Sequence, residues 1–130
     1  MEKPVVIFAA DLGAFFRKVY QPEENVGSMS GFLENILEKG RLHGIYFFGC
    51  LNVEDETTLL SYKAYKHYIS YRKGIHLGGN LPMQKVFNFQ NISYNTVSKV
   101  MKKGMGYVPD AEDDTIGLQV VVPLARREPQ

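Results

Sequence analysis

Two short runs of apolar residues dominate the first half of the chain, at positions 5–10 and 44–51. Both are rich in β-branched or aromatic residues and contain no charged residue. Such runs are typical of strands that are buried on both faces, as in parallel sheets. Residues 12–20 mix apolar side chains with Arg17 and Lys18, and this mixture predicts a short helix after the first strand.

The spacing of apolar positions predicts two further helices. Ser28 or Ser30 is placed to cap the first of them, and Gly40 is placed to end it. Its apolar stripe consists of Phe32, Leu33, Ile36 and Leu37. The second is expected over residues 56–71 with Asp55 as its cap, because apolar or aromatic residues recur there every three to four positions.

The second half of the chain predicts mainly strands. Residues 73–79 indicate a strand that runs into a glycine turn, and residues 95–103 indicate a short helix stopped by Gly104. Two later runs, 106–108 and 118–124, are separated by a polar loop and predict a β-hairpin.

Helices and strands alternate first and a hairpin closes the chain. This order favours an α/β fold with a mostly parallel sheet flanked by helices and a C-terminal β-hairpin. A length of 130 residues suffices for a single domain over residues 1–130 with its own core.

Composition narrows the class of protein. The net charge of +1 gives no electrostatic signature of nucleic-acid binding. The single cysteine, Cys50, cannot form an internal disulfide, which fits a reducing compartment such as the cytoplasm. No segment of the sequence approaches the roughly 18 apolar residues that a membrane span needs.

Candidate chemistry lies where the two apolar strands end. Asp11 and Asn52 follow the first and second strand, and ligands of open α/β sheets bind at the carboxyl ends of strands. An acid after a buried strand can hold Mg²⁺, often through water. The favoured interpretation of Asp11 is nevertheless a cap of the following helix. Leu12 stands where many nucleotide hydrolases carry a glutamate that orients water, and leucine cannot do this.

Other catalytic and metal-binding motifs are missing from the sequence. There is no G-x-x-x-x-G-K-[ST] phosphate loop, and the glycines of residues 74–79 favour a tight turn over a phosphate site. His43, His67 and His76 are not at zinc-ligand spacing, so we expect no metal site. There is also no G-x-S-x-G serine elbow, so the sequence assigns no catalytic residue.

One segment, residues 62–73, interleaves tyrosines with basic residues. Such a pattern could stack bases and bind phosphates, with Lys63, Lys66 and Arg72 as the contacts. We favour an amphipathic helix whose tyrosines pack inside and whose lysines stay in water, since the overall charge is near zero. Nucleic acid is therefore not an expected partner.

Three passages of the chain together resemble a known family. They are residues 5–16, residues 37–47 with the sequence G-R-x-x-G-I, and residues 74–80 with Gln84 followed by residues 103–107. In this order they resemble the second half of an FtsK/SpoIIIE-type P-loop ATPase module. The resemblance is strongest to the C-terminal, degenerate ATPase module of EssC/YukB-like proteins, the membrane-anchored motors of type VII secretion in Gram-positive bacteria.

The resemblance implies a partial RecA-like domain that lacks the Walker A segment. Asp11 would take the position of the Walker B aspartate, and Asn52 would lie near a γ-phosphate-sensing position. ATP and Mg²⁺ would be cofactors of the parent family, with none held by this chain. The implied partners are neighbouring ATPase modules and secreted protein substrates, on the cytoplasmic side of a membrane-anchored parent.

The function expected from these observations is a non-catalytic portion of such a motor, which is not active alone. Two alternatives remain: a fragment of an FtsK/SpoIIIE DNA translocase, and a Mg²⁺-dependent α/β enzyme of another family that uses Asp11. A truncated sheet also exposes an edge that can pair with another chain, so we expect self-association.

Overall fold

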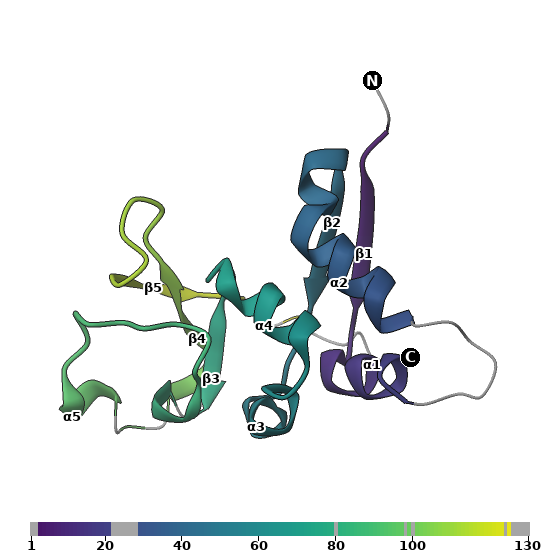
Figure 1. Ribbon diagram of the computed structural model, residues 1–130. Coiled ribbons are helices and arrows are strands. Elements are labelled where there is room, and N and C mark those ends of the chain that lie inside the picture. The colour runs from purple at the N-terminus through teal and green to yellow at the C-terminus, as the bar shows by residue number, and fades with distance from the viewer. Residues whose placement is uncertain are drawn as a thin grey trace, which may run out of the picture. The chain divides into compact units, whose positions relative to one another are not determined.

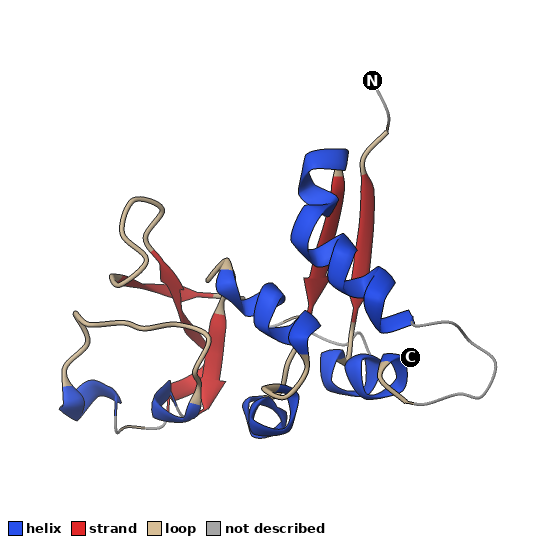
Figure 2. Ribbon diagram, viewed as in Figure 1, coloured by secondary structure: helices blue, strands red, loops and turns tan. Residues whose placement is uncertain are grey.

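The computed structural model describes residues 3–21, 29–79, 81–97, 99, 101–123 and 125. The chain forms two compact units, Met1–Tyr71 (unit 1) and Arg72–Gln130 (unit 2) (Figure 1). The fold is mixed α/β, with a parallel two-stranded sheet in unit 1 and an antiparallel three-stranded sheet in unit 2 (Figure 2). A mostly parallel sheet is therefore wrong for the second half, while a single domain over residues 1–130 stays a prediction.

Unit 1 contains two strands, four α-helices and two short 3-10 helices in its described part. In chain order these are β1 (Val5–Ala9), α1 (Leu12–Val19), α2 (Met29–Lys39), the 3-10 helix Gly40–His43, β2 (Ile45–Gly49), the 3-10 helix Val53–Asp55, α3 (Glu56–Leu59) and α4 (Lys63–Ser70).

The two strands of unit 1 lie side by side and run in the same direction. Ile7 lies opposite Phe47, and these residues, with Ala9, are partly buried on the face that packs against the helices. On the other face Phe8 lies opposite Phe48, and both rings are more than half exposed. The expectation of strands buried on both faces is thus wrong for the outer face, because the described helices of unit 1 pack on the inner face of this sheet.

The core of unit 1 forms where the helices meet the inner face of the sheet. Its buried members are Leu12, Phe16, Leu33, Leu37, Leu59, Ala64 and Tyr65. Edge-to-face contacts join the aromatic rings, with Phe16 and Tyr65 at a centroid separation of 5.9 Å and Phe47 and Tyr68 at 5.6 Å. Edge-to-face pairs of this kind stabilise a core beyond what the burial of their apolar surface contributes.

The predicted end of α2 at Gly40 is confirmed, because the α-helix stops at Lys39, and the predicted cap by Ser28 stays a prediction. Ser30 lies inside α2 and does not cap it, and Ser28 lies outside the described residues. Gly40 continues into a 3-10 turn, and the left-handed residue is Gly44, with φ of 71°. Gly44 donates its backbone N–H to Arg41 O, so the chain reverses there and enters β2.

The long helix expected over residues 56–71 is broken into α3 and α4. Tyr62 has extended backbone angles, and its ring stacks on Tyr20 at 4.5 Å. The Tyr20 hydroxyl accepts the backbone N–H of Ala64 at 2.9 Å and donates to Glu34 Oε1 at 2.8 Å. The N–H of Ala64 therefore bonds to the Tyr20 side chain, whereas in a continuous helix it would bond to a backbone carbonyl of the preceding turn.

Unit 2 is built around β3 (His76–Gly79), β4 (Met101–Pro109) and β5 (Gly117–Val121), in that spatial order. The predicted hairpin is confirmed as β4–β5, although its strands have different bounds and Leu124 lies outside the described residues. The helix expected over residues 95–103 is confirmed only at its start, because α5 spans Tyr94–Val97 and Met101 already begins β4.

Two features of unit 2 differ from a regular hairpin sheet. Gly78 and Gly79 have positive φ angles, and the β3–β4 register shifts between Leu77 and Gly79, so the predicted glycine turn is an irregular strand end. In the β4–β5 loop Asp113 accepts hydrogen bonds from the hydroxyl and N–H of Thr115. These bonds hold the pKa of Asp113 below its usual value.

The core position of Leu12 predicts a large effect of truncation. Leu12 is fully buried and Leu42 is 85% exposed. Leu12→Ala should lower the free energy of unfolding by about 2–5 kcal/mol, as cavity-forming core substitutions do. Leu42→Ala should change it by less than about 0.5 kcal/mol. Urea denaturation followed by circular dichroism measures both; equal effects of the two variants would contradict this description of the core.

Candidate functional site

The carboxyl ends of β1 and β2 lie at the same end of the unit 1 sheet, and this end is called the carboxyl edge below. Beyond the paired strands, Cys50 donates its N–H to Ala9 O at 3.0 Å, and Leu12 donates to Cys50 O at 2.9 Å. These bonds extend the pairing of the strands into the loops that follow. The structure thus places Asp11, Cys50 and Asn52 at the edge where ligands of parallel sheets bind.

Asp11 caps α1. Its backbone is extended, and its Oδ1 accepts the N–H of Ala14 at 3.0 Å. This is the geometry of an N-cap, in which a side-chain oxygen satisfies a free amide of the first turn. The favoured interpretation of Asp11 from the sequence is confirmed as to this contact.

Asn52 has a similar structural task. Its Oδ1 accepts the N–H of Glu54 at 3.3 Å and so caps the 3-10 helix Val53–Asp55. Whether Asp11 and Asn52 are vestiges of nucleotide-binding positions stays a prediction. Each of them already supplies one side-chain oxygen to a local backbone group.

Leu12 is directed into the core and not into this edge. Its side chain is fully buried, and a Cβ placed on Gly49 would lie 2.7 Å from Leu12 Cδ1. The residue after the candidate Walker B acid is therefore part of the packing between α1 and β2. A leucine in this place contributes no group that could orient or activate water.

An ion pair lies beside this edge and was not found from the sequence. Arg17 Nη1 lies 3.5 Å from Asp55 Oδ1, and both side chains are more than a third exposed. Gly13 allows the approach, since a Cβ at this position would lie 3.0 Å from Asp55 Oδ2. Asp55 thus packs beside α1 and makes no side-chain cap to α3, contrary to the predicted role. Exposed pairs of this kind contribute little stability.

A buried acid lies in α3. Glu56 is 2% exposed, and the Tyr65 hydroxyl donates to its Oε1 at 3.2 Å. Burial raises the pKa of the Tyr65 phenol above its usual value, and the negative charge of Glu56 raises it further. Tyr65 therefore remains a donor at neutral pH. The sequence gives no signal for this pair, because an acid in a first helical turn ordinarily interacts with the helix dipole in water.

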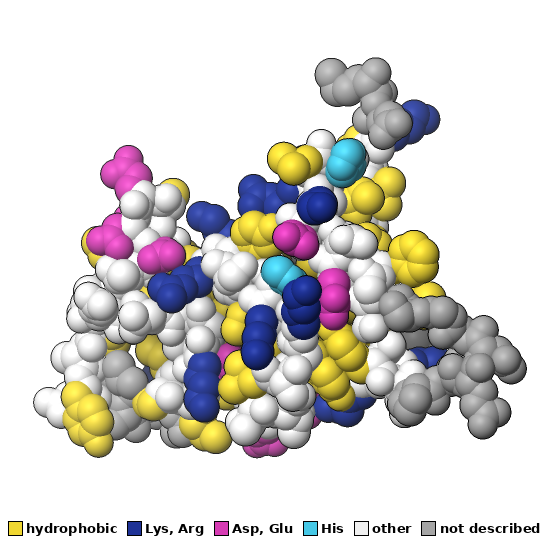
Figure 3. All heavy atoms as spheres, in the orientation of Figure 1, with side chains coloured by type: hydrophobic (Ala, Val, Ile, Leu, Met, Phe, Trp, Pro, Cys, Tyr) yellow, Lys and Arg dark blue, Asp and Glu magenta, His cyan; other side chains and the backbone are white. Residues whose placement is uncertain are grey.

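The tyrosine-rich segment packs as the amphipathic interpretation predicts. Lys63 and Lys66 are exposed, and Figure 3 shows basic side chains over α4. Tyr65 is buried, and Tyr71 donates its hydroxyl to Leu37 O at 3.0 Å. Several of these rings are thus engaged within unit 1, which confirms the favoured interpretation for the packed tyrosines and the two lysines.

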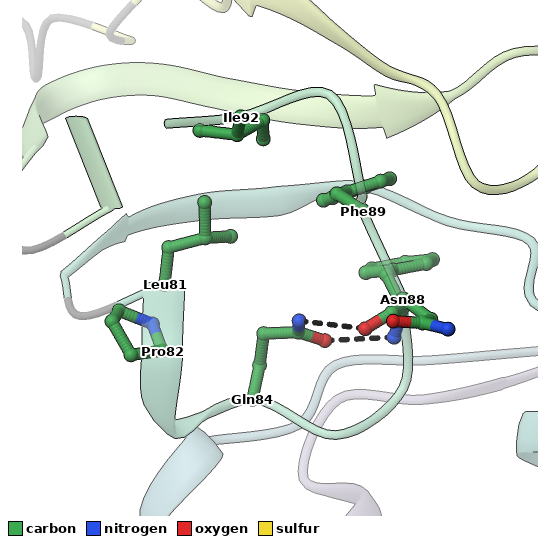
Figure 4. Close-up of a pocket in the computed structure, with 7 residues that line it drawn as sticks. Leu81, Pro82, Gln84, Asn88, Phe89 and Ile92 are labelled. Carbon is green, nitrogen blue, oxygen red and sulfur yellow. Dashed lines mark hydrogen bonds between the residues drawn. The ribbon is translucent and has the colours of Figure 1, made fainter. Parts of the chain in front are cut away.

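Unit 2 contains a small pocket of about 170 Å³ (Figure 4). The amide of Gln84 faces it, but this amide donates to Phe87 O at 2.9 Å and accepts the Phe87 N–H at 2.7 Å. The side chain that could orient a ligand therefore holds the local loop. The lining residues are Leu81, Pro82, Gln84, Phe87, Asn88, Phe89 and Ile92.

Two further properties concern the described residues as a whole. These residues contain no group of three or more His, Cys, Asp or Glu side chains placed to hold a metal ion. None of the helices in this part of the chain is both long and apolar enough to cross a bilayer.

Comparisons of this chain with protein-family models, with curated proteins and with solved structures found no match.

The cap predicts how Asp11 variants behave. Asp11→Ala should lower the free energy of unfolding by about 1 kcal/mol, because the N–H of Ala14 loses its acceptor. Asp11→Asn should change it by only a few tenths of this amount, since asparagine caps about as well as aspartate. Urea titration compares the variants, and an equal loss in both would show that charge, not capping, is what Asp11 contributes.

Proposed function

We propose that this chain is a non-catalytic portion of an FtsK/SpoIIIE-like motor module and acts by docking to other proteins. The observation that carries the proposal is the pairing of a capping Asp11 with a fully buried Leu12. The acid is held by its own helix, and its neighbour offers no catalytic group. The three passages of sequence that resemble such a module supply the family.

The proposal also includes the fold of unit 1, which we infer to be part of a RecA-like domain. β1 and β2 are two neighbouring strands of a RecA-like sheet, in the places of the Walker B and sensor strands. Their parallel pairing supports this assignment. The Walker A half, ATP and Mg²⁺ belong to the parent protein, on the cytoplasmic side of the membrane that anchors it.

The outer face of the unit 1 sheet is the docking surface in this proposal. It consists of Val6, Phe8, Tyr46 and Phe48, each at least 41% exposed. Hydrophobic side chains are visible around β1 and β2 in Figure 3. Parallel sheets are ordinarily covered on both faces, so an open apolar face supports a cover from another protein. A neighbouring module of a type VII secretion motor is the occupant that the family resemblance favours, and secreted proteins are the second.

Activity measurements test the non-catalytic part of the proposal. The isolated chain, incubated with ATP and Mg²⁺, should release no more phosphate than buffer alone. Asp11→Asn, which keeps the cap, is the matched variant. Phosphate release that Asp11→Asn abolishes in a folded protein would refute the proposal and favour a Mg²⁺-dependent enzyme that uses Asp11.

Light scattering tests the docking face. Phe8 and Phe32 are 64% and 69% exposed, but only Phe8 lies on the outer face of the sheet. We expect the isolated chain to self-associate through this face, and Phe8→Lys to lower its weight-average mass, because a charge there must lose water on association. Phe32→Lys is the matched control and should leave the mass unchanged. A strictly monomeric wild type, or equal masses of the two variants, would contradict this role of the outer face.

A further inference from the structure

β5 is an edge strand of the unit 2 sheet, and its outer side is the subject of a separate proposal. Among the described strands, the order β3–β4–β5 leaves β3 and β5 at the edges. The β3 edge is irregular, because Gly78 and Gly79 have positive φ angles and the register shifts there. β5 pairs with β4 in one unbroken register and is the regular edge.

Hydrogen bonds fix which backbone groups of β5 point outwards. Val122 donates to Gly104 O at 2.6 Å and Asp110 donates to Ile116 O at 2.9 Å, at the two ends of the β4–β5 ladder. In an antiparallel pair such bonded positions alternate along the strand. The even-numbered residues from 116 to 122 therefore turn their N–H and C=O groups towards β4, and the odd-numbered residues turn theirs outwards.

The first outward position is already paired by a side chain. The amide of Asn91 donates to Gly117 O at 2.9 Å and accepts the Gly117 N–H at 2.7 Å. Just before it, Gln90 donates its N–H to Thr115 O at 2.8 Å. Asn91 thus occupies the place that a neighbouring strand would take at Gly117.

The last outward position is Pro123, which has no N–H group and therefore needs no hydrogen-bond acceptor. Two outward-facing residues, Gln119 and Val121, lie between these limits. No third strand pairs with this edge within the part of the chain that the structure describes.

We propose that this edge pairs with the same edge of a second copy of the chain. The strands run antiparallel about a two-fold axis at Val120. Gln119 then exchanges two backbone hydrogen bonds with Val121 of the second copy, and the symmetric pair exchanges two more. The pairing is confined to residues 118–122 of each copy, because Asn91 already occupies the place opposite Gly117 where Pro123 of the second copy would otherwise continue the strand.

The side chains of β5 suit a partner identical to itself. A two-fold axis brings like residues together, and charged residues would repel there. The segment from Gly117 to Pro123 contains no charged residue. Leu118, Val120 and Val122 alternate onto one face, and Leu118 and Val122 are 45% and 36% exposed. Each copy thus presents an apolar row that continues across the axis.

The proposed contact is small and joins the two three-stranded sheets into one of six strands. Interfaces below about 1,200 Å² are weak or transient. A covalent trap reports such a contact better than the mass of the complex. It also fixes the register, because disulfides form only between Cα atoms less than about 7 Å apart.

The test places a cysteine at the axis in the full chain. Cys50→Ser removes the native thiol, and Val120→Cys sets two thiols in a non-bonded antiparallel pair, where Cα atoms lie about 4.5 Å apart. With oxidised glutathione, this variant should form disulfide dimers at least about tenfold faster than Leu118→Cys in the same background. In the proposed register the two Leu118 positions lie four residues, or about 13 Å, out of line.

Two further variants distinguish disulfides formed through β5 pairing from disulfides formed by random encounter of chains or by unfolded protein. Gln119→Pro removes an outward N–H that β4 does not use, so it should slow the cross-linking of Val120→Cys. Mixing Leu118→Cys chains with Val122→Cys chains should give heterodimers, because these positions face each other across the axis. Equal cross-linking rates for Val120→Cys and Leu118→Cys in folded protein would overturn the proposal and show a protected edge.

Phe8→Lys distinguishes the β5 contact from the docking surface proposed for unit 1. Phe8→Lys changes the sheet of unit 1 and should leave the cross-linking of Val120→Cys as it is. Loss of cross-linking in that variant would place the contact at the outer face of unit 1 and overturn the β5 pairing.

Discussion

The packing of Leu12 against Gly49 is the constraint on which unit 1 depends. Leu12 begins α1 directly after the β1 loop, and its side chain lies in the core against the end of β2. Gly49 leaves the space, since any Cβ there would lie 2.7 Å from Leu12 Cδ1. The bond from Leu12 N–H to Cys50 O fixes the same junction from the backbone. The start of α1, and with it the cap position of Asp11, follows from this contact.

The consequence for chemistry is direct. A catalytic residue next to Asp11 would have to face the open edge of the sheet, but the backbone turns this position inwards. The only change that could restore a water-orienting group at Leu12 would put a polar side chain into a closed apolar core, at a large cost in free energy. Asp11 therefore has a helix cap on one side and a buried apolar neighbour on the other.

Both sheets leave places where another chain can add to the fold, and they do so differently. In unit 1 an apolar face is open, and apolar contact of this kind is non-directional. In unit 2, within the described part of the chain, the β5 edge is unpaired at Gln119 and Val121, and Asn91 and Pro123 limit it on either side. Backbone pairing is directional and sets register. The first surface suits large partners of varied shape, while the second suits one strand in one alignment.

The sequence by itself determined β1, α1, β2 and the β4–β5 hairpin, and it placed Asp11 at a helix cap. These features depend on a few consecutive residues, so a local pattern suffices to find them. The tertiary structure alone decided the break between α3 and α4, where Tyr20 binds Ala64 across 44 positions of sequence. It also decided the burial of Glu56 with Tyr65, the pairing of Asn91 with Gly117 and the open outer face of β1 and β2. Each of these depends on residues brought together only by folding, and no periodicity along the chain encodes which partner will arrive.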